Sequence, residues 1–575
     1  MPYLRAWTTS KVFCVVLCMG FASGSMAFGA SGVDVKAPRL NVTISPTHAV
    51  NGQADGLDIS YTLSGASEPA GPLTLELDTL APGLQRTSDM VSDLNATDRL
   101  GALPLGAPVI TSGKAGEFQT WTTARSPQGD VRVSYHMHVA KNAAVKRGPQ
   151  VDLQSTGGGV SGGFVGFLLL PRVAGSAFAT RVDWTLAAGE IAVSSYGEGA
   201  YEGLFTADQL RGTLFLAGHV VTYRAPGQRH DGGLSVYALG MSQENIKDVG
   251  DWTARAYAAE IKAFKIDREE PYRFMIRSFT GSANPSGRAA EHSFMLYVPP
   301  GANPGTTVLH SVVAHEMVHS LTRPLEKENI DGDWYTEGVA NYLSITIPYA
   351  AGLYTSREYL ELVKAESAGY YTNALRSLPN SKFAETVWSG RNAWLLPYNR
   401  GSIYFADLDA KLKAKGLNTT VLDLVNEMSR RIDNGEPSDH SVWLSVLAAD
   451  AGPWAISDWE AMMSGRVIFP ASGAFGKCMQ SIRTNVRIFD LGFSSPIRLT
   501  AGSVIGGVVK GSPADVAGLR NGDVLVTGTD INPAAESLDA DVSVTVMRAG
   551  KTRSISFQPG SRKQEGVSWQ DACKK

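Results

Sequence analysis

Several features that mark particular classes of protein are scarce in this sequence. Its 575 residues include only four cysteines, and 52 basic residues nearly balance 55 acidic ones, for a formal net charge of −3. This balance argues against the basic surface that nucleic-acid or polybasic membrane binding requires. No apolar run after residue 21 looks able to span a bilayer, and there is no Walker-type phosphate loop. The composition is that of a globular protein with about three or four domains and no nucleic-acid partner.

The N-terminus has the pattern of a secretory signal peptide. Arg5 and Lys11 precede the apolar run Val12–Phe21, and Ser25 and Ala27 have the spacing of an A-x-A cleavage site. The apolar run is too short to span a bilayer as a stable helix. We therefore predict cleavage after Ala27, export to the periplasm or the medium, and no membrane span after removal of the signal.

The positions of the cysteines agree with export. Cys14 and Cys18 leave with the signal peptide, and Cys18 follows Leu17, which is too large for the residue that precedes a lipidated cysteine. Cys478 and Cys573 remain, an even number for an oxidising compartment. They bracket one small domain, so we predict a disulfide between them. Two buried free thiols are the alternative.

Periodicity divides the chain into a β-rich part and a helical part. From about 33 to 240, short runs alternate apolar and polar residues between Gly, Pro, Asn and Asp, which predicts a β-sandwich-like domain. A helix over 243–264, strands over 272–279 and 292–298, and a helix over 306–321 follow. Helical pattern dominates from 335 to about 463, and short strands return over 489–559. The predicted fold class is multidomain α+β.

Two histidines in the helical part have the spacing of a zinc site. Residues 315–319 form H-E-x-x-H. On a helix, His315 and His319 share a face, so both imidazoles can bind one zinc ion, with Glu316 beside the catalytic water. A buried helix with two hydrogen-bonded histidines is the alternative.

Glu337 is the candidate third ligand, and its presence favours the zinc site over a buried helix with two hydrogen-bonded histidines. It stands in W-Y-T-E-G, 18 positions after His319, and opens a second helix. This is the gluzincin arrangement, a His₂Glu site with a fourth position left open. Asn341 follows one turn later, where it can accept the free N–H of His315 and fix its tautomer. A solvated helix residue is the alternative for Asn341.

With H-E-x-x-H, W-x-x-E-G and P-Y-R-F at 271–274, the sequence resembles the glycyl aminopeptidase family of gluzincins over nearly the whole mature chain. After the signal peptide at 1–27, the resemblance implies three domains. These are a β-rich N-terminal domain over 28–240, a thermolysin-like zinc peptidase domain over 241–472, and a PDZ domain over 473–575. It also implies one zinc ion and removal of N-terminal residues, preferably Gly or Ala, from peptides with a free N-terminus.

The resemblance gives roles to two residues outside the metal set. The family's G-G-L-E-H segment stands here as R-A-A-E-H, without its glycines, and Glu291 in it would hold the substrate's α-ammonium group. An exposed edge-strand Glu is the alternative. The family's Y-x-K-G stands here as Y-N-R-G, in which Tyr398 would donate to the oxyanion. A core tyrosine is the alternative.

The C-terminal segment resembles bacterial PDZ domains. It contains G-S-P-A at 511–514 and G-D-V-L at 522–525, and L-G-F at 491–493 would be the carboxylate loop. Such domains bind peptide C-termini as an added strand, but 530–542 leaves room for only a short second helix. Two other functions stay open. One is a zinc endopeptidase, if the altered segment before Glu291 opens the cleft, and the other is a non-catalytic periplasmic PDZ protein that binds peptides.

Overall fold

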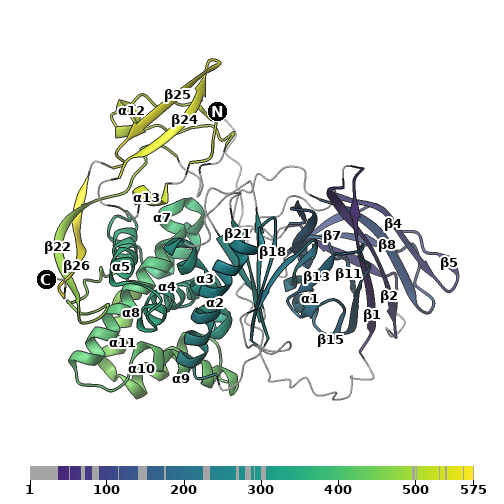
Figure 1. Cartoon of the computed structure of the whole chain (residues 1–575), viewed down its shortest axis with the longest axis horizontal. Coiled ribbons are helices and arrows are strands. Elements are labelled where there is room, and N and C mark those ends of the chain that lie inside the picture. Colours follow the sequence, from purple (N-terminus) through teal and green to yellow (C-terminus); the bar gives the residue numbers. More distant parts are fainter. Residues whose placement is uncertain are drawn as a thin grey trace, which may run out of the picture.

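The computed structural model describes most of the chain beyond its N-terminus (Figure 1). The predicted signal peptide at 1–27 and Glu291 lie outside the described residues. Within the described part, no helix combines the length and apolar character needed to cross a membrane. The described residues are 37–50, 52–65, 71–79, 90–113, 116–139, 152–173, 177–224, 233–266, 271–278, 286–290, 292–298, 306–494, 499, 501–529, 531–535, 537, 540–560 and 562–573.

Among its described residues, the N-terminal part of the chain forms three β-sheets, where a β-sandwich-like domain was expected. Because side chains alternate along a strand, Leu40 and Val42 lie on the same face of theirs. They share one apolar core with Leu63 and Tyr61, their partners on the next strand. The seven-stranded sheet has the order β15 (Tyr201–Phe205), β12 (Phe178–Trp184), β1 (Arg39–His48), β2 (Ala54–Ser64), β8 (Val131–His138), β4 (Val91–Asp98), β5 (Gly101–Ala102). The four-stranded sheet has the order β11 (Leu170–Arg172), β3 (Thr74–Asp78), β7 (Gly116–Thr122), β6 (Val109–Gly113). The five-stranded sheet has the order β14 (Gly197–Glu198), β13 (Ile191–Ser194), β16 (Leu214–Gly218), β10 (Gly159–Gly163), β9 (Gln154–Thr156), and α1 (Ala207–Gly212) precedes β16.

A second five-stranded sheet belongs to the central region of the chain. Its order is β17 (Val221–Arg224), β18 (Leu234–Leu239), β19 (Tyr272–Ser278), β21 (Ser293–Val298), β20 (Ser286–Ala290). The three inner strands are parallel and buried on both faces, whereas β17 and β20 run antiparallel at the edges. We expected the peptidase domain to begin at 241. Because β17 and β18 belong to this sheet, the sheet begins earlier, within the segment assigned from its alternation to the N-terminal domain.

The two faces of this sheet pack against different partners. On one face Phe274 and Phe294 share a core with α2 (Gln243–Ala263) and α3 (Thr307–Leu321). On the other face Met275 and Met295 pack with residues of β13 and β16 from the N-terminal part. The buried guanidinium of Arg277 crosses this second contact and donates to the backbone oxygens of Asp152 at 3.1 Å and of Ser161 at 3.0 Å. A buried charge that is paired in this way holds the two sheets together.

The helical part is built from α4 (Asp333–Ala350), α5 (Ser356–Tyr371), α6 (Phe383–Thr386), α7 (Arg391–Trp394), α8 (Leu396–Ala414), α9 (Val421–Asp433), α10 (His440–Asp450) and α11 (Pro453–Met463). Two of these helices begin with capping boxes, Thr355 with Glu358 and Thr420 with Asp423. Their apolar faces meet in one core that contains the rings of Trp334, Phe405 and Trp443.

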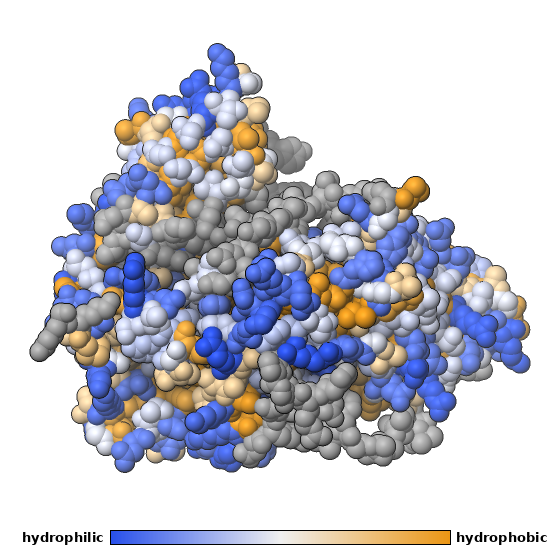
Figure 2. All heavy atoms as spheres, viewed as in Figure 1, coloured by the Kyte–Doolittle hydropathy of each residue, from blue (hydrophilic) through white to orange (hydrophobic). Residues whose placement is uncertain are grey.

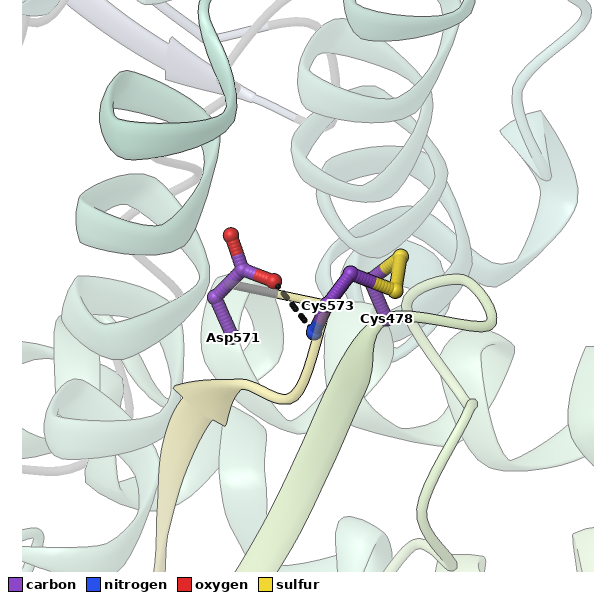
Figure 3. The surroundings of a disulfide bond; sticks show 3 residues. All are labelled: Cys478, Asp571 and Cys573. Carbon is purple, nitrogen blue, oxygen red and sulfur yellow. Dashed lines mark hydrogen bonds between the residues drawn. A yellow bond between two sulfur atoms is a disulfide. The ribbon is translucent and has the colours of Figure 1, made fainter. Parts of the chain in front are cut away.

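A two-stranded ladder joins the C-terminus to the helical part. It consists of β22 (Met479–Arg487) and β26 (Lys563–Asp571), and the predicted disulfide between Cys478 and Cys573 is present at its end (Figure 3). Cys573 N–H also donates to Asp571 Oδ1 at 2.9 Å. Trp569 is buried in the helical core and donates to Ser367 Oγ. The ladder therefore packs as part of the helical region, although we had assigned it to the small C-terminal domain.

The residues between the two ladder strands form a small separate module, which lies beyond α7 in Figure 1. It contains β23 (Val524–Leu525), β24 (Val542–Arg548), β25 (Lys551–Phe557), α12 (Pro513–Val516) and α13 (Asn532–Ala535). Its own apolar core includes Phe489, Leu519, Val544 and Ile555. In the described part of 530–542 the only helix is the four-residue α13, in line with the short helix expected there.

Candidate metal centre

The H-E-x-x-H residues lie on α3, which follows the central sheet. Thr306 caps this helix by accepting from the Leu309 N–H. Val313, Ala314, Met317 and Val318 are fully buried against the core. Because a helix turns by about 100° per residue, His315 and His319 are left together on a second, partly exposed face.

Glu337 on α4 completes a compact group with these histidines. His315 Nε2 and His319 Nε2 lie 2.9 Å apart, and each is 3.2 Å from Glu337 Oε2. The Glu337 side chain is 1% exposed. In the described part of the chain, its second oxygen, Oε1, has no hydrogen-bond partner. The structure thus brings together the three residues proposed as metal ligands.

The arrangement fits a zinc ion. Two ring nitrogens and a carboxylate oxygen converge, which is the donor set of catalytic zinc sites. Without a cation, a buried carboxylate oxygen would stay unpartnered, which is costly. The one other group of such residues found in the described chain, Cys478, Asp571 and Cys573, has its two thiols consumed by the disulfide.

The surroundings set the protonation of the two carboxyl groups here. Burial would raise the pKa of Glu337, but the adjacent charges and hydrogen bonds of His319 and His315 prevail and lower it to about 2. Glu337 is therefore an anion at neutral pH, as a metal ligand must be. Burial raises the pKa of Glu316, and the two histidines only partly oppose this. A raised pKa makes Glu316 a better proton acceptor than an ordinary surface carboxylate.

Glu316 lies against the backbone of the edge strand β20. A Cβ on Gly287 would lie 2.6 Å from Cδ, Cγ and Oε1 of Glu316, closer than real atoms approach. The backbone of Ala289 hydrogen-bonds to the same carboxylate. We did not identify Gly287 from the sequence, although it directly precedes the R-A-A-E-H segment in which the family's glycines were sought. Glu291 lies outside the described residues, between the end of β20 and the start of β21.

Tyr398 on α8 stands beside the metal group. Its ring is nearly parallel to that of His315, at 13°, with the centroids 5.9 Å apart. The ring of Trp394 is also close to Tyr398, 6.3 Å away between centroids. The structure thus brings Tyr398 next to the proposed ligands, while its role toward an oxyanion stays a prediction.

Two glycines explain how Tyr398 and Glu337 come together. A Cβ on Gly338 would lie 2.5 Å from Gly401 Cα, and a Cβ on Gly401 would lie 2.1 Å from the Trp334 oxygen. Helices α4 and α8 therefore cross with their backbones in contact, which side chains at these positions would prevent. Gly338 follows Glu337 and Gly401 is one turn after Tyr398, so this crossing places both side chains at the same site.

Asn341 and Arg400 have partners that the sequence did not indicate. The Asn341 amide nitrogen donates to both carboxylate oxygens of Glu366 at 3.1 Å each, and acceptance by its oxygen from His315 stays a prediction. Helix α5 supplies this carboxylate, and nothing in the local sequence of α4 indicates its approach. Arg400, which stands where the family has Lys, is buried and donates to the backbone oxygens of Arg376 and Leu378.

Comparison with known proteins shows the fold. No family model and no curated protein matches the sequence. Among solved structures, an aminopeptidase N family protein from Idiomarina loihiensis has a TM-score of 0.66 at 14% identity, over 93% of this chain and 98% of that chain. An M1 zinc metallopeptidase from Deinococcus radiodurans (TM-score 0.44, 15% identity, 77% and 96% covered) and yeast LTA4 hydrolase (0.43, 13%, 77% and 71%) are more distant. This chain thus has a multidomain α+β fold similar to that of the Idiomarina protein along nearly the whole length of both.

Proposed function

We propose that this protein is a zinc-dependent aminopeptidase that acts on peptides in an exported compartment. The observation that carries the proposal is the convergence of His315, His319 and Glu337 on one point, with Glu316 beside it. The similarity of fold to a protein described as belonging to the aminopeptidase N family supports it. A chain that only bound peptides would have no need for this complete group, which argues against the non-catalytic alternative.

The residues of the site are proposed to have distinct roles in peptide hydrolysis. His315, His319 and Glu337 would hold the zinc ion, which supplies Lewis-acid activation of water and of the scissile carbonyl. Glu316 takes the proton of the attacking water and passes it to the leaving amine. The hydroxyl of Tyr398 donates to the oxygen on which negative charge develops.

Strand β20 is proposed to align the substrate. It is the last strand of its sheet, so its outer edge has no strand partner among the described residues. An extended peptide can add to such an edge by backbone hydrogen bonds, and here it would pass directly over Glu316. Glu291, which follows this strand, is proposed to hold the free α-ammonium group. A preference for N-terminal Gly or Ala and membership of the glycyl aminopeptidase family complete the proposal.

A panel of aminoacyl reporter substrates, assayed with and without a chelator, tests this function. We expect hydrolysis that the chelator abolishes and that added zinc restores, fastest with Gly or Ala. One peptide compared with its amine free and acetylated separates the two peptidase hypotheses. Cleavage of the free form alone supports the aminopeptidase, whereas equal rates favour the endopeptidase.

The compartment and the C-terminal module are part of the same proposal. The signal-peptide pattern at 1–27 and the disulfide support export. The module is proposed to be a PDZ domain. Figure 2 shows apolar residues on the surface of this module. Its exposed apolar residues include Val504, Val509 and Val516. In the expected carboxylate loop, however, the Gly492 N–H already donates to Asp490 Oδ1 at 2.9 Å, so a peptide C-terminus would have to displace this bond. Titration with peptides that carry a free or an amidated C-terminus tests such binding.

A further inference from the structure

Three helices meet beside the metal group, and one carboxylate hydrogen-bonds to two of them from the third. Glu366 on α5 accepts from Asn341 Nδ2 on α4, at 3.1 Å to each of its oxygens. Its Oε2 also accepts from Asn399 Nδ2 on α8, at 3.4 Å. Both donors belong to the helices that bring Glu337 and Tyr398 together.

The two asparagines lie close in the chain to residues of the proposed site. Asn341 lies one helical turn after Glu337, and Asn399 directly follows Tyr398. Asn399 is buried, and α5 comes so close to it that a Cβ on Gly369 would lie 2.7 Å from its Oδ1. The amide of Asn399 therefore lies against α5, close both to its backbone at Gly369 and to the Glu366 carboxylate.

Gly338 and Gly401 set how closely α4 and α8 approach each other. Buried rings such as Trp334 on α4 and Phe405 on α8 hold the two helices together, and even a small rotation of α8 about its axis would displace the Tyr398 hydroxyl. Hydrogen bonds from one charged group to both helices resist such movement, because charge-assisted bonds are the stronger ones.

We propose that Glu366 is a positioning residue for the hydrolytic reaction. It sets the rotation of α8 relative to α4, and hence the place of the Tyr398 hydroxyl relative to the group formed by His315, His319 and Glu337. Glu366 touches neither substrate nor metal in this role. The inference rests on the proposed peptidase function and names a determinant of that same site.

The substitution Glu366→Gln tests it, because the amide keeps the shape and removes the charge. We expect kcat to fall by roughly 10–100-fold, the range seen when residues behind a metal centre are changed. KM should change less than about twofold and zinc content should stay the same, because the change affects a hydrogen bond used mainly in the transition state. Glu361→Gln on the same helix is the matched control, since Glu361 is exposed and pairs only with Lys364 among the described residues. It should leave kcat unaltered.

A double-variant cycle shows whether Glu366 acts through Tyr398. In a Tyr398→Phe background, Glu366→Gln should cost little more, because the hydroxyl that it positions is gone. Losses that multiply in full would overturn the proposal, as would an unchanged kcat in Glu366→Gln. If Glu366→Gln does not fold, Asn399→Ala removes only the bond to α8 and must show the same loss of kcat. A wild-type protein that hydrolyses no peptide would refute the proposed function itself, which is a distinct result.

Discussion

The carboxylate of Glu316 occupies the space that a side chain at Gly287 would need. A Cβ there would lie 2.6 Å from Glu316 Cδ, so a side chain at residue 287 would displace the Glu316 carboxylate from its place against the edge strand β20. This contact joins the residue proposed as proton acceptor to the strand proposed to bind substrate. Its consequences can be tested by substitution.

Gly287→Ala should reduce turnover by about 100-fold, because displacing a catalytic group by about 1 Å has effects of that size. Zinc content should stay at one per chain, since none of the three ligands is touched. Steady-state kinetics together with metal analysis checks this. Gly71→Ala is the control, because a Cβ at Gly71 would meet nothing within 4 Å. Unchanged turnover in Gly287→Ala would show that Glu316 does not depend on this contact.

Substitutions of two residues on α3 should distinguish loss of metal binding from loss of catalysis. His319→Ala should lower zinc content well below one per chain and abolish peptide hydrolysis, because one of three ligands is lost. Glu316→Gln should keep the zinc and lose activity, because an amide cannot accept the proton of water. Metal analysis by mass spectrometry beside the kinetic assay distinguishes the two. Full zinc content in His319→Ala would contradict the ligand set.

Tyr398→Phe should lower kcat by roughly 100- to 1,000-fold, about 3–4 kcal/mol, with little change in KM, as expected for a donor used only in the transition state. The ring should keep its place beside His315, because that contact does not involve the hydroxyl. Pre-steady-state and steady-state rates on one dipeptide measure the effect. A tenfold rise in KM at constant kcat would instead indicate a role in ground-state binding.

Removing the disulfide should destabilise the helical region as well as the C-terminus. The 95-residue separation of Cys478 and Cys573 corresponds to roughly 4–5 kcal/mol in the chain-entropy model. Because Trp569 of the same ladder is buried in the helical core, reductant should lower the temperature at which the whole helical region unfolds. Thermal unfolding followed by tryptophan fluorescence measures this. The Cys478→Ser, Cys573→Ser double variant should be insensitive to reductant, and two free thiols in native material would contradict the bond.

The C-terminal module should lose stability in acid through Asp523. This buried carboxylate accepts from Arg548 Nε at 2.6 Å and from the Arg520 N–H at 2.9 Å. The hydrogen bonds from Arg548 chiefly hold its pKa below the ordinary 3.8. A lowered pKa in the folded state stabilises the module above pH 3.8, and this contribution disappears as the pH falls through the folded-state pKa.

Asp523→Asn should therefore cost roughly 1.5–3 kcal/mol at pH 7, the range for hydrogen bonds to a charged group. The difference from wild type should shrink as the pH falls below 3.8. Hydrogen exchange of the β24 amides, measured at pH 7 and below pH 3.8, reports the stability of the module alone. If wild type and variant differ in stability by the same amount at both pH values, the ionised carboxylate contributes nothing.

Much of the metal centre could be predicted because its signals are local. His315 and His319 are one helical turn apart, so the period of the helix alone brings their rings to one face. Glu337 lies near the start of the next helix, after a connection of recognisable length. The limits of α3 followed from periodicity in the same way, and this helix begins and ends within one residue of the range expected. Each of these inferences needs only neighbours in the chain.

The tertiary structure alone decided what lies against these residues. No periodicity in 286–290 indicates that Gly287 meets Glu316, and nothing in α4 indicates that Asn341 meets Glu366 on α5. Strand β17 likewise alternates apolar and polar residues like the strands before it, yet it pairs into the central sheet. A sequence pattern shows which face of an element is buried, whereas the partner on that face depends on how distant segments pack. The residues proposed as ligands could therefore be identified from local sequence, whereas the contacts that position them could not.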